Sequence, residues 1–233
     1  MIGIHQSQFL PWVPYFYKIA KSDPFVILDD VQFQKNGVQN RNKIKTPQQD
    51  KWITVPVSYD FGDPINKVRI TDNFACVRLL KTIEMNYKKS VFFKDIFPSL
   101  EKIFLRERDT LYSLNSELLD FIMQKLGFET AIVYSSDLKL TAKKDELVIE
   151  IIKARHENEY LSGKGALGYM DLEKFKKEGI SVYTYDFQYS RYPQLWGKES
   201  GFIPELSVID LLFNGLDQAK DYILKNGSIT KIT

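Results

Sequence analysis

The chain has 233 residues and a formal net charge of +2; 44% of its residues are hydrophobic and 27% are charged, as in an ordinary soluble globular protein. The near-neutral charge argues against an electrostatic grip on bulk nucleic acid. The single cysteine, Cys76, excludes a disulfide framework and a thiolate metal cluster and fits a reducing compartment. Because no apolar stretch reaches the roughly 18 residues of a membrane span and the N-terminus lacks the features of a signal peptide, we expect a cytoplasmic protein.

The N-terminal segment has the pattern of a strand, a helix and a second strand. Met1–Ile4 is expected to form a very short buried strand, and Pro14–Ala20 carries aromatic and apolar residues at helical spacing. After a break at Ser22-Asp23-Pro24, the continuous apolar run Phe25–Leu28 predicts a strand that is covered on both faces. Two strands joined by a helix in so short a segment indicate a parallel βαβ unit.

The rest of the chain alternates strands with helices. Apolar residues recur every three or four positions between Phe74 and Gly127, which predicts three or four helices, the last ending at the glycine. Further strands are expected at Trp52–Val57, Lys67–Ile70, Ala131–Tyr134, Tyr160–Gly163 and Ile180–Tyr185. Further helices are expected at Lys144–Glu157, Leu172–Glu178, Ser207–Leu212 and Leu216–Asn226. The predicted fold is therefore α/β: one domain over residues 1–233 with an N-terminal Rossmann-like βαβ sheet, a helical insertion at about 74–127 and a helical C-terminus.

Polar residues follow the first predicted strand. His5 lies between the amides of Gln6 and Gln8, and Trp12 stands in the turn beyond them. An imidazole at a strand end can contact a phosphate or act as a general base at neutral pH, and its polar neighbours are expected to bind substrate. The alternative is a buried, hydrogen-bonded histidine with a structural task. The other histidine, His156, lies among charged residues and is expected on the surface.

Two aspartates, Asp29 and Asp30, follow the second predicted strand. Carboxylates in this position can bind a metal, hold a ribose hydroxyl or orient an amine. Gln32 is expected to share the face of Asp30, because side chains alternate in an extended segment. The alternative is a turn that uses one aspartate as a cap.

The densest cluster of hydrogen-bond donors lies in a predicted basic loop. Its members are Asn40, Arg41, Asn42, Lys43 and Lys45. The guanidinium offers a planar fork for phosphate, the two ammonium groups offer point charges, and the amides suit a nucleotide or a polyhydroxyl ligand. Since no acidic residue stands between Val31 and Gln49, an anion site is favoured over a solvated charged loop.

Two later segments are weaker candidates for substrate binding. Ser162, Gly163 and Gly165 follow a predicted strand and resemble a nest of backbone amides for phosphate or carboxylate, although the spacing is not that of a Walker loop. Gln194 lies in a polar aromatic loop that can clamp a ring.

A series of specific motifs runs through essentially the whole chain. The first is His5-Gln6-Ser7-Gln8-Phe9-Leu10-Pro11-Trp12, followed by Tyr15-Phe16. The others are Asp29-Asp30-Val31-Gln32-Phe33, Asn40–Lys45, Thr54-Val55-Pro56-Val57, Tyr160–Ala166, Pro193-Gln194 and Phe202–Asn214. With these motifs the sequence resembles the WbqC-like family.

The resemblance implies a place in bacterial surface-polysaccharide biosynthesis, such as that of the O-antigen of lipopolysaccharide. Family members are typically encoded among such genes, and some are proposed to attach glycine or another aminoacyl group to an amino sugar. The chain departs from the family pattern at Pro14, where a glycine is usual, and at Leu79, where a histidine is usual. If that histidine is catalytic in other members of the family, Leu79 cannot take its role in this chain.

The expected function is that of a transferase or ligase that forms an amide on a nucleotide-linked amino sugar. His5 would act as the general base or as a phosphate contact, and Asp29 or Asp30 would orient the amine or hold a hydroxyl. The cations at 41, 43 and 45 would bind the diphosphate. If the acyl group is activated on the enzyme, ATP and magnesium are required; if the acyl or aminoacyl donor arrives activated, neither is needed. No metal site of the protein itself is expected.

Other functions stay open at this point. One is a non-catalytic sugar-nucleotide-binding protein of the same pathway. Another is a nucleotidylyl transferase, since a strand, His5, a helix and an acidic strand end look like the opening of nucleotidylyltransferase and pantothenate-synthetase folds, whose second motif histidine has no counterpart here. Nucleic acid is the least expected partner, a tRNA-borne acyl donor being the exception that the basic loop would accommodate. A homodimer is compatible with the sequence.

Overall fold

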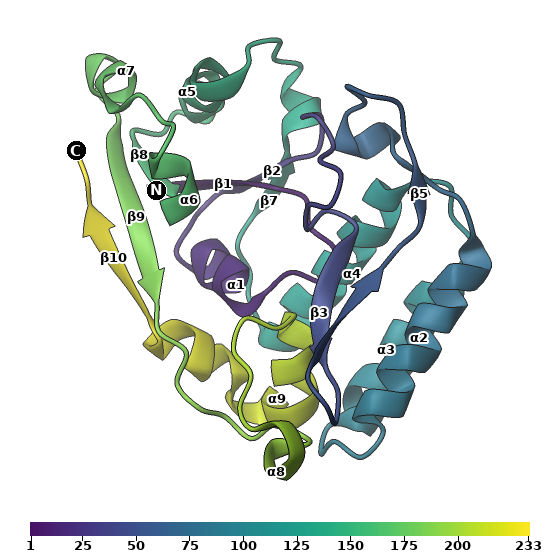
Figure 1. The fold of residues 1–233 in the computed structure, drawn as a ribbon. Coiled ribbons are helices and arrows are strands. Elements are labelled where there is room, and N and C mark those ends of the chain that lie inside the picture. The colour runs from purple at the N-terminus through teal and green to yellow at the C-terminus, as the bar shows by residue number, and fades with distance from the viewer.

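A six-stranded sheet forms the centre of the molecule, with its strands in the order β10-β9-β8-β1-β2-β7 (Figure 1). The computed structural model describes residues 1–233. The strands are β1 (Ile2–Gln6), β2 (Phe25–Leu28), β7 (Ile132–Tyr134), β8 (Glu159–Ser162), β9 (Ser181–Phe187) and β10 (Gly227–Lys231). Neighbouring strands are parallel, except that β10 is antiparallel to β9. The predicted α/β fold is confirmed, and the Rossmann-like description stays a prediction.

The order of the strands reverses at β1. Strands β2 and β7 lie on one side of it, and β8 and β9 lie on the other. Strand β1 pairs with β2 as far as Gln6 but with β8 only at Ile2 and Gly3, so the carboxyl half of β1 is not paired with β8. In open α/β sheets, ligands bind outside the carboxyl ends of the strands at the position where the order reverses.

Helices cover both faces of the sheet. Side chains alternate between the two faces along each strand, so each face has its own set of buried residues. On one face, Phe25 and Ile27 join the larger hydrophobic cluster together with α1 and α9. On the other face, Ile4 and Val26 pack in a smaller cluster with α5 and α7. The helices are α1 (Val13–Ala20), α2 (Asn73–Tyr87), α3 (Phe93–Leu105), α4 (Leu111–Leu126), α5 (Lys144–Ala154), α6 (Lys164–Leu167), α7 (Leu172–Lys177), α8 (Gly197–Ser200) and α9 (Val208–Lys225). None of them is long and apolar enough to span a lipid bilayer.

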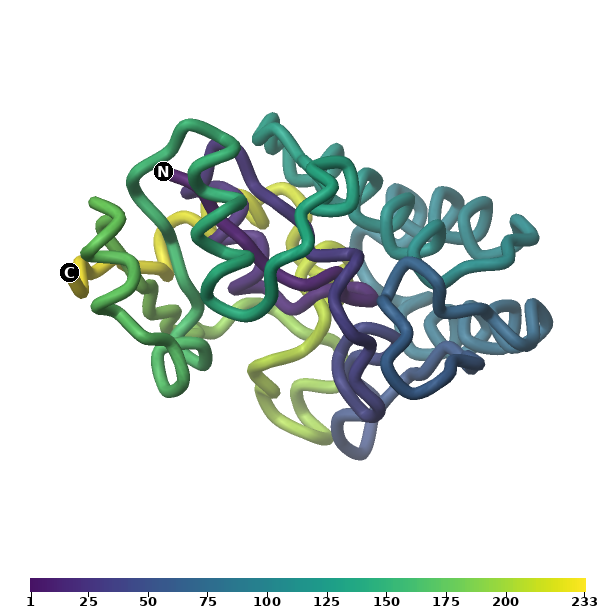
Figure 2. Tube along the Cα trace, turned by 90° about the horizontal axis from the view of Figure 1, so that it is seen from above, coloured from purple at the N-terminus to yellow at the C-terminus, as the bar shows by residue number.

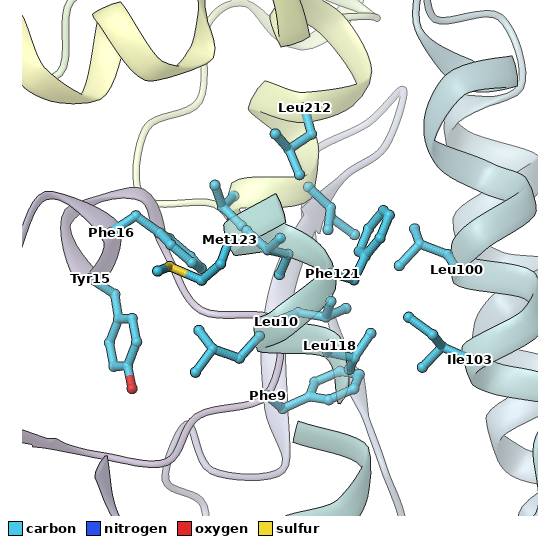
Figure 3. Packing of buried hydrophobic residues seen from close by; sticks show 14 of the residues in the cluster. Phe9, Leu10, Tyr15, Phe16, Leu100, Ile103, Leu118, Phe121, Met123 and Leu212 are labelled. Atoms are coloured by element: carbon cyan, nitrogen blue, oxygen red, sulfur yellow. The ribbon is translucent and has the colours of Figure 1, made fainter. Parts of the chain in front are cut away.

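Helices α2, α3 and α4 occupy the stretch predicted as a helical insertion and lie together at one end of the molecule (Figure 2). The segment that leaves β1 joins this layer to the sheet. Phe9 and Leu10 are fully buried, and Figure 3 shows them between the aromatic residues of α1 and the apolar side chains of α3 and α4. Helix α4 ends at Gly127 in the left-handed conformation expected of a C-cap, with φ of 62°.

The predicted basic loop is a strand, so the prediction of irregular structure there was wrong. Strand β3 (Arg41–Lys45) pairs antiparallel with β4 (Asp50–Thr54). Within β3, Asn42 and Ile44 are buried and alternate with the partly exposed Arg41 and Lys43. The density of charged and amide side chains hid this alternation from the sequence pattern.

The strand predicted at Trp52–Val57 is interrupted at Pro56, which cannot donate a hydrogen bond to a strand ladder. Only its first part lies in β4. The chain beyond the proline turns away, and β5 (Val57–Ser58) pairs with β6 (Arg69–Ile70).

The C-terminal prediction was also incomplete. The helices predicted at Ser207–Leu212 and Leu216–Asn226 form one element, α9, with a kink at Gly215 where the backbone leaves the helical region. The chain then continues into strand β10, which had not been predicted, so the structure does not end in a helix.

A buried polar network fastens the segment between β9 and α9 to the body of the molecule. Its centre is Asp210, which is fully buried. The carboxylate accepts hydrogen bonds from Tyr87 Oη at 2.9 Å, Tyr192 Oη at 2.7 Å and Gln194 Nε2 at 2.9 Å. Lys45 Nζ donates to Gln194 Oε1 at 2.9 Å. Burial raises the pKa of Asp210 to about 6, although the three donors and the lysine oppose the shift.

The raised pKa predicts how Asp210→Asn changes the pH dependence of stability. Between pH 3.8 and about 6 the folded state binds more protons at this carboxyl than the unfolded state, so its contribution to stability is lost as pH rises through 6. Relative to D210N, the wild-type free energy of unfolding should therefore fall by up to about 3 kcal/mol between pH 4 and 7. Denaturant unfolding at several pH values measures this. D221N, at an exposed aspartate of the same helix, is the control, and a pH-independent difference for D210N would contradict the prediction.

Candidate functional site

The carboxyl edge of the sheet collects polar groups from several strands. Strand β1 ends with His5 and Gln6, Asp29 and Asp30 follow β2, and Ser162 closes β8. Because these strands are parallel, their carboxyl ends meet at one edge. The structure thus brings together candidates that the sequence places more than a hundred residues apart.

His5 lies partly exposed at the end of β1. Its ring packs edge-to-face against Tyr15 of α1, with 5.0 Å between the ring centres. The Nδ1 atom is 3.3 Å from the carbonyl oxygen of Gln6 and 3.4 Å from the side-chain nitrogen of Gln8. No protein group is hydrogen-bonded to Nε2, so this atom is free to meet a ligand.

Burial of the ring, together with the nearby Lys18 ammonium, lowers the pKa of His5 to about 3. The imidazole is therefore neutral throughout the physiological pH range. A neutral ring can accept a hydrogen bond or a proton, but it carries no charge for a phosphate. Of the two roles expected from the sequence, the neutral ring disfavours an ionic contact with phosphate and leaves its Nε2 atom as an acceptor.

Lys18, a lysine of α1 that is only 1% exposed, was not predicted as a site residue. Gly3 and Ser7 donate their backbone N–H groups toward β2, so the carbonyl of Ile4, which alternates with them, faces β8. Lys18 Nζ donates to this carbonyl at 2.5 Å, where pairing between β1 and β8 has stopped. Burial lowers the pKa of Lys18 to about 7. A lysine within the aromatic stripe of α1 was the signal in the sequence.

Asp29 holds neighbouring segments together. Its Oδ1 accepts from Ser135 Oγ at 3.1 Å and from the backbone N–H of Ser136 at 3.0 Å. Its Oδ2 accepts from Ser136 Oγ at 2.7 Å and from Asn66 Nδ2 at 3.2 Å. Both oxygens of this buried carboxylate are therefore occupied by the short 3₁₀ helices η1 (Ile65–Lys67) and η2 (Ser135–Leu138).

Asp30 is the better placed of the two aspartates for a ligand. It is partly exposed, and only its Oδ1 has a partner, the hydroxyl of Ser135. Its Oδ2 is free to hold an amine or a hydroxyl. Gln32 is exposed nearby, where its backbone forms an isolated bridge with Pro64.

A magnesium ion would find few ligands at this edge. No group of three or more histidine, cysteine or acidic side chains lies close enough together to hold a metal ion. Asp29 is saturated, which leaves Asp30 as the carboxylate that fits a magnesium carried in by nucleotide phosphates.

The loop before β3 lies over the end of β1. Gln39 donates through Nε2 to Gln6 Oε1 at 2.8 Å, and its own Oε1 accepts from the backbone of Gln34 at 2.9 Å. Asn115 of α4 donates to the Gln39 carbonyl at 2.9 Å. These amide contacts fix the loop above the strand end, so Gln6 is already engaged by the protein.

Tyr15 and Gln8, which both contact His5, line a cavity of about 10 Å³, room for roughly one water-sized group. Polar residues on its wall include Ser7, Gln8, Tyr15, Asn115, Ser116 and Tyr134. The side-chain oxygens of Gln8 and Asn115 are buried and have no hydrogen-bond partner. A buried polar group without a hydrogen-bond partner costs about 1–3 kcal/mol of folding stability. Two unpaired acceptors on one small cavity therefore favour the presence of a hydrogen-bond donor in it. Asn115 was not identified from the sequence, because an asparagine within an amphipathic helix gives no signal.

The cluster on β3 divides into two sets. Asn40 donates to the Val55 carbonyl at 2.9 Å and Asn42 donates to the Leu10 carbonyl at 2.7 Å, so both amides hold the backbone. Lys45 is fully buried in the network around Asp210, where it meets Gln194, another predicted site residue. These four residues therefore stabilise the fold instead of facing a ligand.

The other set faces outward. The Arg41 guanidinium carbon lies 4.4 Å from the ring centre of Trp52, and Lys43 Nζ lies 5.3 Å from it. Lys43 also forms an ion pair with Asp50 at 2.7 Å. Trp52 was missed because the sequence pattern showed it only as a member of a strand.

The remaining candidates form no hydrogen bond with His5. Trp12 is partly exposed and forms an isolated backbone bridge with Ser207. Ser162 is fully buried, but a Cβ added to Gly163 or Gly165 would meet nothing within 4 Å. Gly163 has an ordinary φ of −81°, so the fold itself does not require glycine there.

Lys18→Met should change stability in a pH-dependent way. Because the pKa of Lys18 is about 7 in the folded state and 10.5 when exposed, the unfolded state binds more protons between these values, and wild-type stability is lost as pH falls through this window. The free energy of unfolding of K18M should therefore rise relative to wild type by up to about 4 kcal/mol as pH falls from 10 to 7. K21M, at the exposed lysine after the same helix, is the control. A difference that does not vary with pH would contradict the assignment.

Gly163→Ala should leave folding intact and weaken binding of a ligand that approaches the backbone of this segment. The added methyl group has space, and alanine restricts the unfolded chain, so stability should be unchanged or up to about 1 kcal/mol higher. Gly127→Ala, at the left-handed C-cap with φ of 62°, should instead be destabilising. Thermal unfolding and titration with a sugar nucleotide measure both effects, and unchanged affinity of G163A would remove this segment from the site.

The chain as a whole is similar to known proteins. Residues 6–222 match the WbqC-like protein family. The chain is 38% identical over 226 residues to the uncharacterized protein Rv1507c of Mycobacterium tuberculosis (strain ATCC 25618 / H37Rv), and the matched region covers 95% of this chain and 96% of that protein. No solved structure matches. A family match over nearly the full length shows that the chain belongs to the WbqC-like protein family, as its motifs predicted.

Proposed function

We propose that the protein forms an amide between an acyl or aminoacyl group, such as glycine, and the amino group of a nucleotide-linked amino sugar for bacterial surface-glycan biosynthesis. The observation that carries this proposal is the cavity beside the neutral His5. Its two unpaired buried oxygens, on Gln8 and Asn115, require an N–H or O–H donor. A primary amine satisfies both oxygens at once, and its small size suits the cavity.

The proposed chemistry needs an amine that is neutral and oriented. The oxygens of Gln8 and Asn115 would accept the two N–H groups of the amine and leave its lone pair directed at the acyl carbon. As the C–N bond forms, the nitrogen becomes strongly acidic, and one N–H would leave its amide acceptor and pass its proton to His5 Nε2. The bond from the acyl carbon to its activating group then breaks, and that group leaves with the electron pair. Asp30 would hold a neighbouring hydroxyl through its free oxygen.

The placement of the cations supports recognition of the nucleotide part. Arg41 and Lys43 face outward from a hairpin that adjoins the end of β1, whereas the residues that line the cavity are uncharged. A substrate with one anionic end and one amine end fits this separation.

One observation favours a second function. A histidine with a pKa near 3 is a weak base, and such a residue suits hydrogen bonding to a ligand better than proton transfer. This favours a non-catalytic sugar-nucleotide-binding protein of the same pathway as the alternative.

His5→Gln separates the two functions, because glutamine keeps a polar side chain at the site but cannot take a proton. For an enzyme we expect turnover to fall by about 10²- to 10⁴-fold, while affinity for the sugar nucleotide stays within about threefold. The measurement is amide formation, followed by mass spectrometry with a thymidine-diphosphate amino sugar and glycine in the presence of ATP and magnesium, and binding of the same sugar nucleotide by calorimetry.

The control is His156→Gln, which changes the other histidine, exposed just beyond the end of α5, and should leave both quantities unchanged. If wild type binds the sugar nucleotide but no acyl donor yields an amide, the binding-protein alternative replaces the enzyme.

A further inference from the structure

Trp52 is unusually exposed for a tryptophan: 43% of its surface is accessible to solvent. It lies on β4 directly opposite Lys43, and the neighbouring Arg41 stacks its guanidinium 4.4 Å from the centre of the indole ring. The other side of the hairpin packs inward through Asn42 and Ile53. The outward side therefore presents a planar aromatic group beside a planar cation, and the fold does not cover it.

Arg41 has unused hydrogen-bonding capacity. Its Nη2 donates to the carbonyl oxygen of Asn36, and its buried Nε has no partner. A guanidinium has five N–H donors, and a buried donor without an acceptor needs an explanation in a folded protein. The Nε atom itself is enclosed, so an anion from outside the chain would meet the guanidinium at Nη1 and at the second N–H of Nη2. Lys43 is already paired with Asp50, so Arg41 is the stronger contact for an incoming anion.

The position of this pair relates it to the reactive end of the site. Asn40 and Gln39 connect directly to Arg41, and Gln39 is hydrogen-bonded to Gln6 at the end of β1. His5 and its cavity lie at that same strand end. A ligand that runs along the covering loop would therefore reach the hairpin at one end and His5 at the other.

We propose that Trp52 and Arg41 form the subsite for the nucleoside end of a nucleoside-diphosphate sugar. The base stacks on the aromatic–guanidinium pair, and the diphosphate accepts hydrogen bonds from the free donors of Arg41. This inference rests on the proposed function for the identity of the sugar end. Stacking on an aromatic ring is available to any base, so the subsite recognises a nucleoside diphosphate without strong selection among bases.

A longer nucleic acid fits this surface less well. A strand of phosphates needs a continuous row of cations, whereas here one lysine is neutralised by Asp50 and the whole chain carries a net charge of only +2. One stacked ring beside one free guanidinium matches a single nucleotide unit.

The test compares three probes on purified protein: thymidine diphosphate, uridine diphosphate and inorganic pyrophosphate. We expect wild type to bind both nucleoside diphosphates about 5- to 150-fold more tightly than pyrophosphate, the range for stacking of one base. Trp52→Leu should reduce the affinity for both nucleoside diphosphates to that for pyrophosphate and leave pyrophosphate binding unchanged. Trp52→Phe should keep most of the preference, because a ring remains, and R41A should weaken all three probes.

The matched control is Lys51→Ala, which removes an exposed cation next to Trp52 in the same strand and should change the three affinities little. Circular dichroism shows whether each variant is folded. Equal affinity of wild type and W52L for thymidine diphosphate would overturn the inference, as would equal binding of nucleoside diphosphate and pyrophosphate by wild type.

The two proposals fail separately. If W52L loses the nucleoside preference but no amide forms with any donor, the subsite stands and the proposed reaction falls. If amide formation occurs and W52L leaves the KM for the sugar nucleotide unchanged, the reaction stands and the subsite is rejected.

Discussion

The end of pairing between β1 and β8 requires new hydrogen-bond partners for buried carbonyl groups, and the site is built around those partners. An unsatisfied buried carbonyl costs about 1–3 kcal/mol, so Ile4 and Gln6 need donors where β8 no longer supplies them. Helix α1 supplies both: Lys18 bonds to Ile4 at 2.5 Å, and Tyr15 bonds to Gln6 at 3.3 Å. These bonds fix α1 against the carboxyl end of β1. Tyr15 thereby packs edge-to-face against the ring of His5 and forms part of the cavity wall.

Polar residues that look alike in the sequence differ in whether their hydrogen-bonding groups have partners within the protein. The carboxylate of Asp29 and the amide of Asn42 are occupied by partners from distant segments, and their loss would release the 3₁₀ helices or the hairpin. Asp30 and Arg41 instead keep oxygens or N–H groups that the protein does not use. Neighbouring residues thus differ in whether their polar groups hold the fold or stay available for hydrogen bonding.

The electrostatic character of the edge changes along its length. Around His5 the titratable groups are shifted toward their neutral forms, since burial lowers the pKa of His5 to about 3 and that of Lys18 to about 7. A neutral imidazole can accept a hydrogen bond or a proton from an amine. The hairpin, by contrast, keeps its cations partly in solvent, where an anionic group can reach them. This separation of a weakly charged pocket from a cationic surface is the physical basis of both proposals.

Local pattern in the sequence determined the α/β class, the helix at 13–20, the strand Phe25–Leu28 and the glycine cap of α4, because each depends on residues within a few positions of one another. It also placed His5 and Asp30 at strand ends that meet. It did not reveal β3, whose charged side chains hid the alternation, or β10, which exists only because β9 offers an edge. Burial and pairing decided the rest. Lys18 reaches β1, Asn115 lines the cavity, and Trp52 stacks with Arg41 through contacts between separate elements. Lys45 and Gln194 join a structural network in the same way. Such contacts leave no periodic trace in the sequence, and only the tertiary structure determines them.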